Sequence, residues 1–525
     1  MSLSTGSVYA TLPRTQRGLP LVLGGDPKGK TFLYPNGHSI VIRDIENPSI
    51  ADIYTEHSAQ TTVAKYSPSG FYICSADVSG KVRIWDTTQK EHILKNEFQP
   101  FAGTVKDLAW SADSQRIVAV GEGREKFGHV FMMETGTSVG EIAGHSKIIN
   151  SCDFKPSRPF RIITGSEDNF VGIYEGPPFK FKHQLEDHSR FVQAVRFSPS
   201  GDLFASGGFD GKIFLFKSAD YSKVGEFGSP AHGGGVYAIS WSPDGKQLLS
   251  ASGDKTCKTW DVESLTLVTE FNMGSDLLDQ QVSCLWQGKH MLSVSLSGFI
   301  NYLDANNPSK PLRVVKGHNK SITAMAIHKD PGSENSFIFT GSHDGCVTRW
   351  DAETGENERC AGPTHSNQVA GMTLDQTSLY TCGLDDFVRI SSLATSECVT
   401  SVKMDSQPRD IALVKERSIL IVAGFEDVSV ISASGNKLSR LPVKFEPNCV
   451  DAHPSGSDCA VGGNKDSSVH IFSIDAGNSL SAKKQLEHRE AVTDVAYSPD
   501  GTYLAACDSN RKVVLYLSSN YEVSL

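Results

Sequence analysis

Short segments in which polar and apolar residues alternate recur along the whole chain. Residues 81–85 (KVRIW) alternate as expected for a strand with one buried face. They follow the apolar segments 62–66 and 71–75, which the turn residues Ser67-Pro68-Ser69-Gly70 separate. Proline fixes φ and glycine tolerates positive φ, so this turn predicts a hairpin. With residues 92–95 as an outer strand, the pattern predicts a unit of four antiparallel strands.

This unit recurs twelve times, and each copy has a characteristic residue pair at the end of its third strand. Successive pairs are 40 to 48 residues apart. They are Arg43-Asp44, Trp85-Asp86, Met133-Glu134, Tyr174-Glu175, Phe216-Lys217, Trp260-Asp261, Leu303-Asp304, Trp350-Asp351, Ser391-Ser392, Ser432-Ala433, Phe472-Ser473 and Tyr516-Leu517. A period in the low forties, with Gly-His near the start and Trp-Asp at the end, is typical of WD-repeat blades. The predicted fold class is all-β, built from WD-repeat β-propellers.

Twelve blades exceed one propeller ring, so we expect two. Seven blades close a ring, which predicts a complete seven-bladed propeller over residues 19–316. Residues 317–525 contain only five units and predict a second, C-terminally truncated propeller; the chain is either a fragment or variant, or its second ring is incomplete. Residues 1–18 form an N-terminal segment, in which residues 7–12 are a candidate strand for closing the last blade of the second ring. Without that blade, the segment is expected to dock loosely.

Composition argues against several classes of protein. The net charge is −10 and the pI about 5.9, with acidic and basic residues interspersed, so no basic stripe indicates nucleic-acid binding. No apolar run is long enough to cross a membrane. The eleven cysteines are scattered singly without a C-x-x-C pair, which argues against a zinc site and predicts a reducing compartment, the cytosol. No metal or other cofactor is expected.

Histidine and aspartate recur at fixed places in the units and suggest a structural role. A buried network of such groups with a Ser or Thr locks the inner turn of a blade, because buried polar groups need partners. A scaffold repeats this set in many blades, whereas a catalyst needs one copy, so we predict that the protein is not an enzyme. The Gly-rich stretches 121–123 and 231–235 are interpreted as flexible loops. The residues concerned are His145, His188, His318, Asp77, Asp168, Asp210, Asp254 and Asp344.

Several segments that are not general WD-repeat consensus resemble the actin-interacting protein 1 family, also called WD-repeat protein 1. They are residues 53–57, 84–89, 120–125, 175–182, 279–281, 298–301 and 307–310, and the resemblance runs from about residue 8 to residue 517. The family has two seven-bladed propellers and fourteen repeats, which implies that the last two repeats are lacking here. The resemblance further implies a cytoplasmic protein of the actin cytoskeleton. It would bind actin filaments and promote disassembly of those decorated with cofilin, with barbed-end capping in some members.

The same resemblance implies a partner-binding site for actin and cofilin at Glu125, Glu167, Lys180, Phe181 and Phe191. Strand order independently places Glu125, Glu167 and Phe191 on one face of the propeller. The turns between the second and third strands lie on the same face as the connections between blades. Exposed aromatic and charged residues together are typical of a binding hot spot. Each of these residues also has an alternative role. Phe181 lies on one side of a strand with Phe179 and could pack between blades 4 and 5. Phe191 could be a core residue, and Glu125 an ordinary solvated charge.

Two other functional classes remain as alternatives. A general WD-repeat scaffold or adaptor for ubiquitin ligation or signalling would normally carry an adaptor helix or domain, and the sequence contains none that we recognise. An enzyme would need a catalytic motif such as G-x-S-x-G or H-E-x-x-H, and neither occurs.

Overall fold

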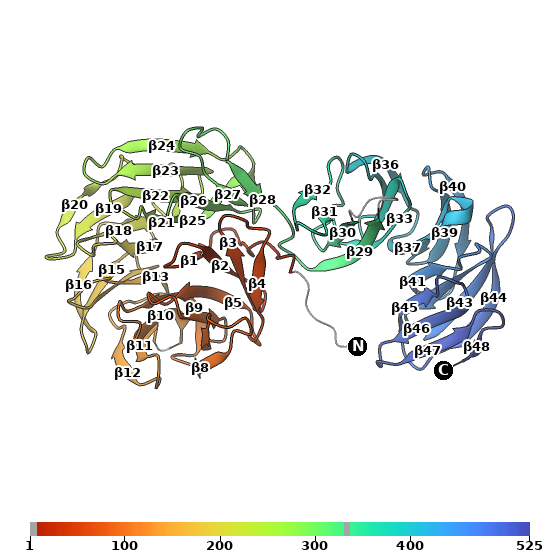
Figure 1. Cartoon of the computed structure of the whole chain (residues 1–525), viewed down its shortest axis with the longest axis horizontal. Helices are drawn as coiled ribbons and strands as arrows, with labels where there is room; N and C mark the ends of the chain where they lie inside the picture. Colours follow the sequence, from red (N-terminus) through yellow and green to blue (C-terminus); the bar gives the residue numbers. More distant parts are fainter. Residues whose placement is uncertain (1–7, 125, 330–335, 525) are drawn as a thin grey trace. The chain divides into compact units, whose positions relative to one another are not determined.

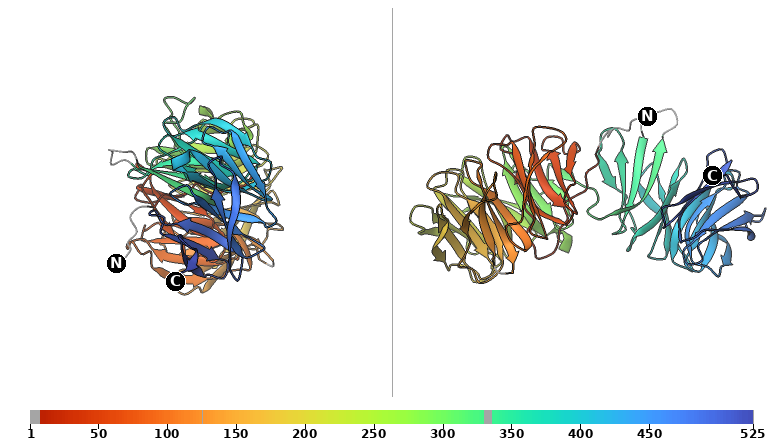
Figure 2. Two further views of the ribbon diagram at one scale, coloured as in Figure 1. Left: turned by 90° about the vertical axis from the view of Figure 1, so that its right-hand side faces the viewer. Right: turned by 90° about the horizontal axis from the view of Figure 1, so that it is seen from below.

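The computed structural model describes residues 8–124, 126–329 and 336–524. They form twelve separate four-stranded antiparallel sheets, each made of four consecutive strands (Figures 1 and 2). The prediction of twelve four-stranded β-units is therefore confirmed. The chain divides into two compact units, Met1–Asn319 and Lys320–Leu525.

The first unit contains seven sheets, coloured red to green in Figure 1. The first three comprise β1 (Gly24–Gly25), β2 (Thr31–Asn36), β3 (Ser39–Asp44) and β4 (Ala51–Tyr54); β5 (Thr61–Tyr66), β6 (Tyr72–Asp77), β7 (Val82–Asp86) and β8 (Leu94–Phe98); and β9 (Gly103–Trp110), β10 (Arg116–Gly123), β11 (Gly128–Met132) and β12 (Ser138–Glu141). The fourth and fifth comprise β13 (Ile149–Phe154), β14 (Arg161–Ser166), β15 (Val171–Glu175) and β16 (Lys180–Leu185); and β17 (Val192–Phe197), β18 (Leu203–Gly208), β19 (Ile213–Lys217) and β20 (Lys223–Glu226). The sixth and seventh comprise β21 (Val236–Trp241), β22 (Gln247–Ser252), β23 (Thr256–Asp261) and β24 (Leu267–Asn272); and β25 (Gln281–Gln287), β26 (His290–Ser295), β27 (Ile300–Tyr302) and β28 (Arg313–Val315).

The second unit contains five sheets, coloured cyan to blue. The first three comprise β29 (Ile322–Lys329), β30 (Ser336–Ser342), β31 (Val347–Asp351) and β32 (Asn357–Arg359); β33 (Val369–Leu374), β34 (Ser378–Gly383), β35 (Phe387–Ser392) and β36 (Glu397–Lys403); and β37 (Pro408–Val414), β38 (Ile419–Gly424), β39 (Asp427–Ser432) and β40 (Lys437–Pro442). The last two comprise β41 (Pro447–Ala452), β42 (Asp458–Gly463), β43 (Ser468–Ile474) and β44 (Leu480–Glu487); and β45 (Val492–Tyr497), β46 (Tyr503–Asp508), β47 (Val513–Leu517) and β48 (Glu522–Val523).

Helical structure is limited to two short 3-10 turns in the described ranges, η1 (Leu277–Asp279) and η2 (Lys415–Arg417). No helix in the described part of the chain is long and apolar enough to cross a membrane.

Local turn chemistry explains the hairpins between first and second strands. In the second sheet, the Ser67 backbone N–H donates to the Tyr72 carbonyl at 2.8 Å, and the Tyr72 N–H donates to the Ser67 hydroxyl at 3.1 Å. Gly70 has a φ of +72°, a conformation that glycine adopts without strain. The same turn occurs at residues 198–203, 242–247 and 498–503, where the serine again accepts from the backbone. The hairpin predicted from Ser-Pro-x-Gly is therefore confirmed.

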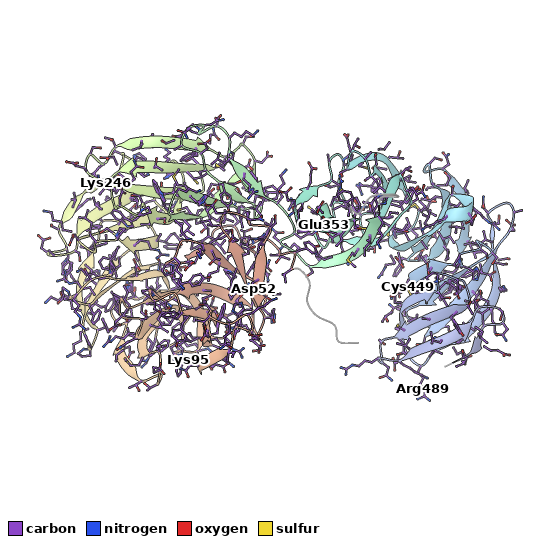
Figure 3. The ribbon with its side chains drawn as sticks, in the orientation of Figure 1. Asp52, Lys95, Lys246, Glu353, Cys449 and Arg489 are labelled. Carbon is purple, nitrogen blue, oxygen red and sulfur yellow. The ribbon has the colours of Figure 1, made fainter. Side chains whose placement is uncertain are left out.

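The outer strand of the second sheet begins later than predicted. It is β8, from Leu94, whereas the sequence pattern placed it at residues 92–95. His92 has a φ of +48°, a left-handed turn conformation incompatible with a strand, and its Nε2 lies 2.7 Å from the Asp52 carboxylate of the first sheet. Figure 3 labels Asp52 on β4 and Lys95 on β8, the two outer strands that flank this turn.

The hydrophobic core lies between neighbouring sheets. Trp85 is fully buried and stacks on Tyr54 of the preceding sheet, with ring centroids 4.2 Å apart. The first and seventh sheets of the first unit also share a core cluster, which includes Phe32, Tyr34, Leu292 and Ile300.

Residues 8–12 form no strand and pack on the first unit. Ala10 and Leu12 are buried in the cluster shared by the first and seventh sheets. The Leu12 N–H donates to the His318 carbonyl at 2.6 Å, and the Arg43 guanidinium donates to the Ala10 carbonyl at 2.8 Å. These contacts argue against loose docking of this part of the N-terminal segment.

Candidate functional site

In the described part of the chain, buried histidines each contact a hydroxyl and an aspartate of their own sheet, as in the second, fourth, fifth, sixth and ninth sheets. His188 Nδ1 lies 3.1 Å from the Asp210 carboxylate, and its Nε2 lies 2.8 Å from the Ser206 hydroxyl. Because equivalent sets recur in several of the described sheets, they stabilise a repeated turn, as expected for a scaffold. The other sets are His57, Ser75 and Asp77; His145, Thr164 and Asp168; His232, Ser250 and Asp254; and His365, Thr381 and Asp385.

Electrostatics fit this structural role. Burial holds the pKa of His57 and His365 below the ordinary value, which favours neutral imidazoles that can both donate and accept. Burial alone would raise the pKa of Asp254, but hydrogen bonds from His232 and Thr256 hold it below its usual range. Within the described ranges, no group of three His, Cys, Asp or Glu side chains could hold a metal ion.

The sequence interpretation missed the set built on His232. This residue lies in the Gly-rich stretch 231–235 that was attributed to loop flexibility. Its spacing to Ser250 and Asp254, 18 and 22 residues, equals the spacing from His188 to Ser206 and Asp210. This equal spacing could have identified the set of His232 from the sequence.

Two of the predicted site residues share one end of neighbouring sheets. We call this end the Phe191 face; around the fourth sheet it comprises the turn 167–170 and the connection 186–191. Glu167 is half-buried and donates its N–H to the Ile148 carbonyl at 2.9 Å. Phe191 is 40% exposed, and its carbonyl accepts the Phe209 N–H at 2.8 Å. The Asn169 amide donates to the Ser189 carbonyl at 3.4 Å, which ties the turn of Glu167 to the connection of Phe191.

Lys180 and Phe181 lie on the outer strand of the fourth sheet. Lys180 is exposed and pairs with Glu175, at the end of the sheet opposite to Glu167. Phe181 is 45% exposed and meets the Tyr174 ring edge-on at a centroid distance of 5.8 Å. A Cβ on Gly144 would lie 2.9 Å from the Phe181 ring, so this ring packs closely on the connection from the third sheet.

Phe179 and Phe181 have different environments, contrary to one alternative from the sequence. Phe179 is 1% exposed and packs edge-on against Phe154 at 5.3 Å, in the core between the third and fourth sheets. Phe181 lies at the start of the outer strand β16, where residues 180–183 are all exposed. The fifth predicted site residue, Glu125, lies outside the described residues.

A buried ion cluster links the first strands of four sheets, and the sequence analysis did not identify it. The Asp107 carboxylate, fully buried, lies 2.7 Å from Lys65 Nζ and 3.0 Å from the Arg196 guanidinium. It also accepts hydrogen bonds from the Ser151 hydroxyl and the Cys152 N–H. Burial would raise the pKa of Asp107, but the two cations hold it below its ordinary value. The four partners come from consecutive sheets, so the cluster stabilises their arrangement.

Comparisons with known proteins agree with the repeat architecture. The family model described as "WD domain, G-beta repeat" matches residues 49–86, 136–175, 309–351 and 481–516. The model described as "Anaphase-promoting complex subunit 4 WD40 domain" matches residues 195–290.

Longer matches are to individual proteins. Actin-interacting protein 1 of Drosophila melanogaster is 58% identical over 517 residues, which is 98% of this chain and 84% of that relative. WD repeat-containing protein 1 of Gallus gallus is 53% identical over 513 residues, covering 97% of this chain and 84% of the relative. The protein of the same name from Mus musculus gives the same identity and coverage.

Proposed function

Because this chain belongs to the family of actin-interacting protein 1 and WD repeat-containing protein 1, we propose that it binds actin filaments and promotes disassembly of cofilin-decorated filaments. The observation that carries this proposal is an identity of 53% to 58% along nearly the whole chain. The site of action is the cytoplasmic actin cytoskeleton, and the partners are actin filaments and cofilin.

We propose that the partner surface includes Glu167, Lys180, Phe181 and Phe191, together with Glu125. Exposure of both phenylalanines supports this, since aromatic side chains that remain 45% and 40% exposed are available to bury against a partner. Lys180 adds an exposed charge on the same strand as Phe181. Glu167, Lys180, Phe181 and Phe191 come from the fourth sheet and the connection that follows it, so one partner can reach several of them.

Co-sedimentation tests the proposed function. We expect the full chain to pellet with actin filaments and to pellet more tightly when cofilin decorates them. Fluorescence microscopy should then show faster filament shortening when chain and cofilin are both present than with cofilin alone. Equal pelleting and equal shortening with and without cofilin would contradict the proposal and leave a general WD-repeat scaffold as the remaining hypothesis.

We also propose that residues 19–316 close a seven-bladed ring. Contacts between the first and seventh sheets support this. The Gln287 side-chain amide donates to the Thr31 carbonyl at 2.9 Å, and the Tyr302 hydroxyl donates to the Ile45 carbonyl at 2.8 Å. Residues 1–18 are proposed as the N-terminal segment that precedes this ring.

For residues 317–525, we propose a second propeller that is an open arc of five sheets. Its support is the environment of the fourth residue in the first strands β29, β37, β41 and β45; the corresponding Met372 in β33 is half-buried. Met325 in β29 is 61% exposed, whereas Ile411, Val450 and Val495 are 4% to 5% exposed, because a preceding sheet covers them. Ile322 and Ile327, on the same strand as Met325, are also about half exposed, at 47% and 55%.

Hydrogen exchange followed by mass spectrometry tests the open arc. We expect amides of β29 to exchange faster than those of β37, because local opening is easier where few apolar contacts cover a strand. The comparison is internal, since both are first strands of four-stranded sheets in the same unit. Equal protection of the two strands would argue for a covered β29 and against the arc.

A further inference from the structure

We propose that the Phe191 face of the first unit carries a collar of cations and aromatic rings that holds an acidic, extended segment of the protein partner. The collar consists of Arg17, Lys147, Arg190, Phe191, Phe209 and Tyr237. This inference rests on the proposed function, because it states which kind of segment on the decorated filament the Phe191 face binds. It adds to the predicted site five residues that the sequence analysis did not select.

The N-terminal segment brings Arg17 onto this face. The Arg14 guanidinium donates to the Gln60 side chain at 3.0 Å, next to the start of the second sheet. The Thr15 hydroxyl donates to the Leu296 carbonyl at 2.5 Å, in the turn after β26 of the seventh sheet. Burial raises the pKa of Tyr237 in the sixth sheet, whereas the nearby Arg17 guanidinium and Gly18 backbone act to lower it, so both lie close to this side chain. Residues 14–18 therefore contact three sheets, and Arg17 remains exposed beside Tyr237.

Aromatic rings continue from Tyr237 towards the predicted site. Phe209 meets Tyr237 edge-on at a centroid distance of 6.0 Å, and its N–H bonds the Phe191 carbonyl. A cation accompanies each of the two phenylalanines. Lys147 Nζ lies 5.8 Å from the Phe191 ring, and the Arg190 guanidinium lies 5.7 Å from the Phe209 ring. Both cations are exposed, so their polar ends are available to a ligand.

The cations of the collar have no carboxylate partner within the part of the chain that the structure describes. Among the described residues, no ion pair within 4.0 Å involves Arg17, Lys147 or Arg190, although many other pairs are formed. The aspartates of the adjoining turns, Asp168 and Asp210, are buried against His145 and His188. Three accessible positive charges beside aromatic rings therefore favour a ligand that carries carboxylates.

The collar extends from Lys147 before the fourth sheet to Tyr237 in the sixth, which favours an extended peptide over a small anion. In β17, Val192 pairs with Gly208 and Ala194 with Gly207, so Gln193 is the extra residue of a bulge. Tyr237 occupies the equivalent bulge position in β21. Gln193 is 5% exposed, and its Oε1 accepts no hydrogen bond in the described structure.

Charge reversal tests the collar. The test variant is R17E/K147E/R190E, and the matched control is K90E/K217E/K246E, which makes the same charge change at exposed residues on the opposite face. Lys246 is labelled in Figure 3, in the turn between β21 and β22. Each full chain is measured for co-sedimentation with cofilin-decorated filaments at several salt concentrations. Binding of a fluorescent peptide of alternating glutamate and glycine is measured by anisotropy.

We expect the test variant to bind filaments about tenfold more weakly at low salt, with a smaller salt dependence, while the control binds as the unmodified chain. Equal binding by the two variants would overturn the collar. If the unmodified chain does not bind filaments at all, the proposed function fails, and peptide binding then tests the collar separately. Loss of peptide binding in the test variant but not in the control supports the collar. Unchanged peptide binding in the test variant overturns it. Reversal-sensitive binding to phosphatidylserine vesicles without peptide binding would overturn it in favour of a membrane surface.

Discussion

Replacing Asp107 by alanine should lower the free energy of unfolding of the first unit by about 3 kcal/mol. The carboxylate is fully buried, and it neutralises Lys65 and Arg196 at 2.7 and 3.0 Å. Its loss leaves two cations whose side chains are only 17% and 23% exposed. That remaining access to water places the cost at the lower end of the range for breaking a buried pair. D107N should cost less, because the amide still accepts hydrogen bonds from Ser151 and Cys152.

Tryptophan fluorescence during denaturant unfolding measures this change, since five of the six tryptophans lie in the first unit. The matched control is E141A, which breaks the pair with Lys126. That pair is equally short at 2.9 Å but 44% and 47% exposed, so we expect a loss below about 1 kcal/mol. If D107A and E141A cost the same, the cluster does not stabilise the arrangement of the sheets that it links.

Features that depend on local sequence were predictable. The hairpin turn of Ser67 to Gly70 and the alternation in β7 depend on residues only a few positions apart, so one unit could be interpreted by itself. Repetition then strengthened the prediction, because the same local pattern recurred at a nearly constant period. The histidine sets follow the same logic, and His232 was missed only because its Gly-rich surroundings were considered without its spacing to Ser250.

Features that depend on contacts between sheets were not predictable from one sequence. Asp107 and Arg196 are separated by 89 residues, and no local pattern relates them. The different burial of Phe179 and Phe181 depends on how the third and fourth sheets pack, because Phe179 enters the core between them and residues 180–183 are all exposed. Likewise, the contacts of Arg14, Thr15 and Gly18 with three sheets of the first unit depend on how those sheets are arranged.

The double variant F181A/F191A should retain its fold and lose most cofilin-dependent disassembly. Both rings are more than one-third exposed, so their truncation opens no large cavity in the core. Each anchor of a protein interface typically contributes about 1–3 kcal/mol to docking, and such contributions are not additive. Association with decorated filaments should therefore weaken by at least about tenfold. Filament shortening by microscopy and pelleting at increasing chain concentration measure the two effects separately.

F71A is the control that distinguishes a binding surface from a general effect of losing an exposed ring. Phe71 is 51% exposed and has its own cation, with Lys28 Nζ 5.5 Å from the ring, but it lies in a turn on the opposite face. Its truncation should leave disassembly within about twofold of the unmodified chain, because surface substitutions outside an interface change little. F71A thereby tests whether the loss of one exposed ring elsewhere on the first unit is enough to reduce disassembly. Full activity of F181A/F191A, or an equal loss in F71A, would remove Phe181 and Phe191 from the partner surface.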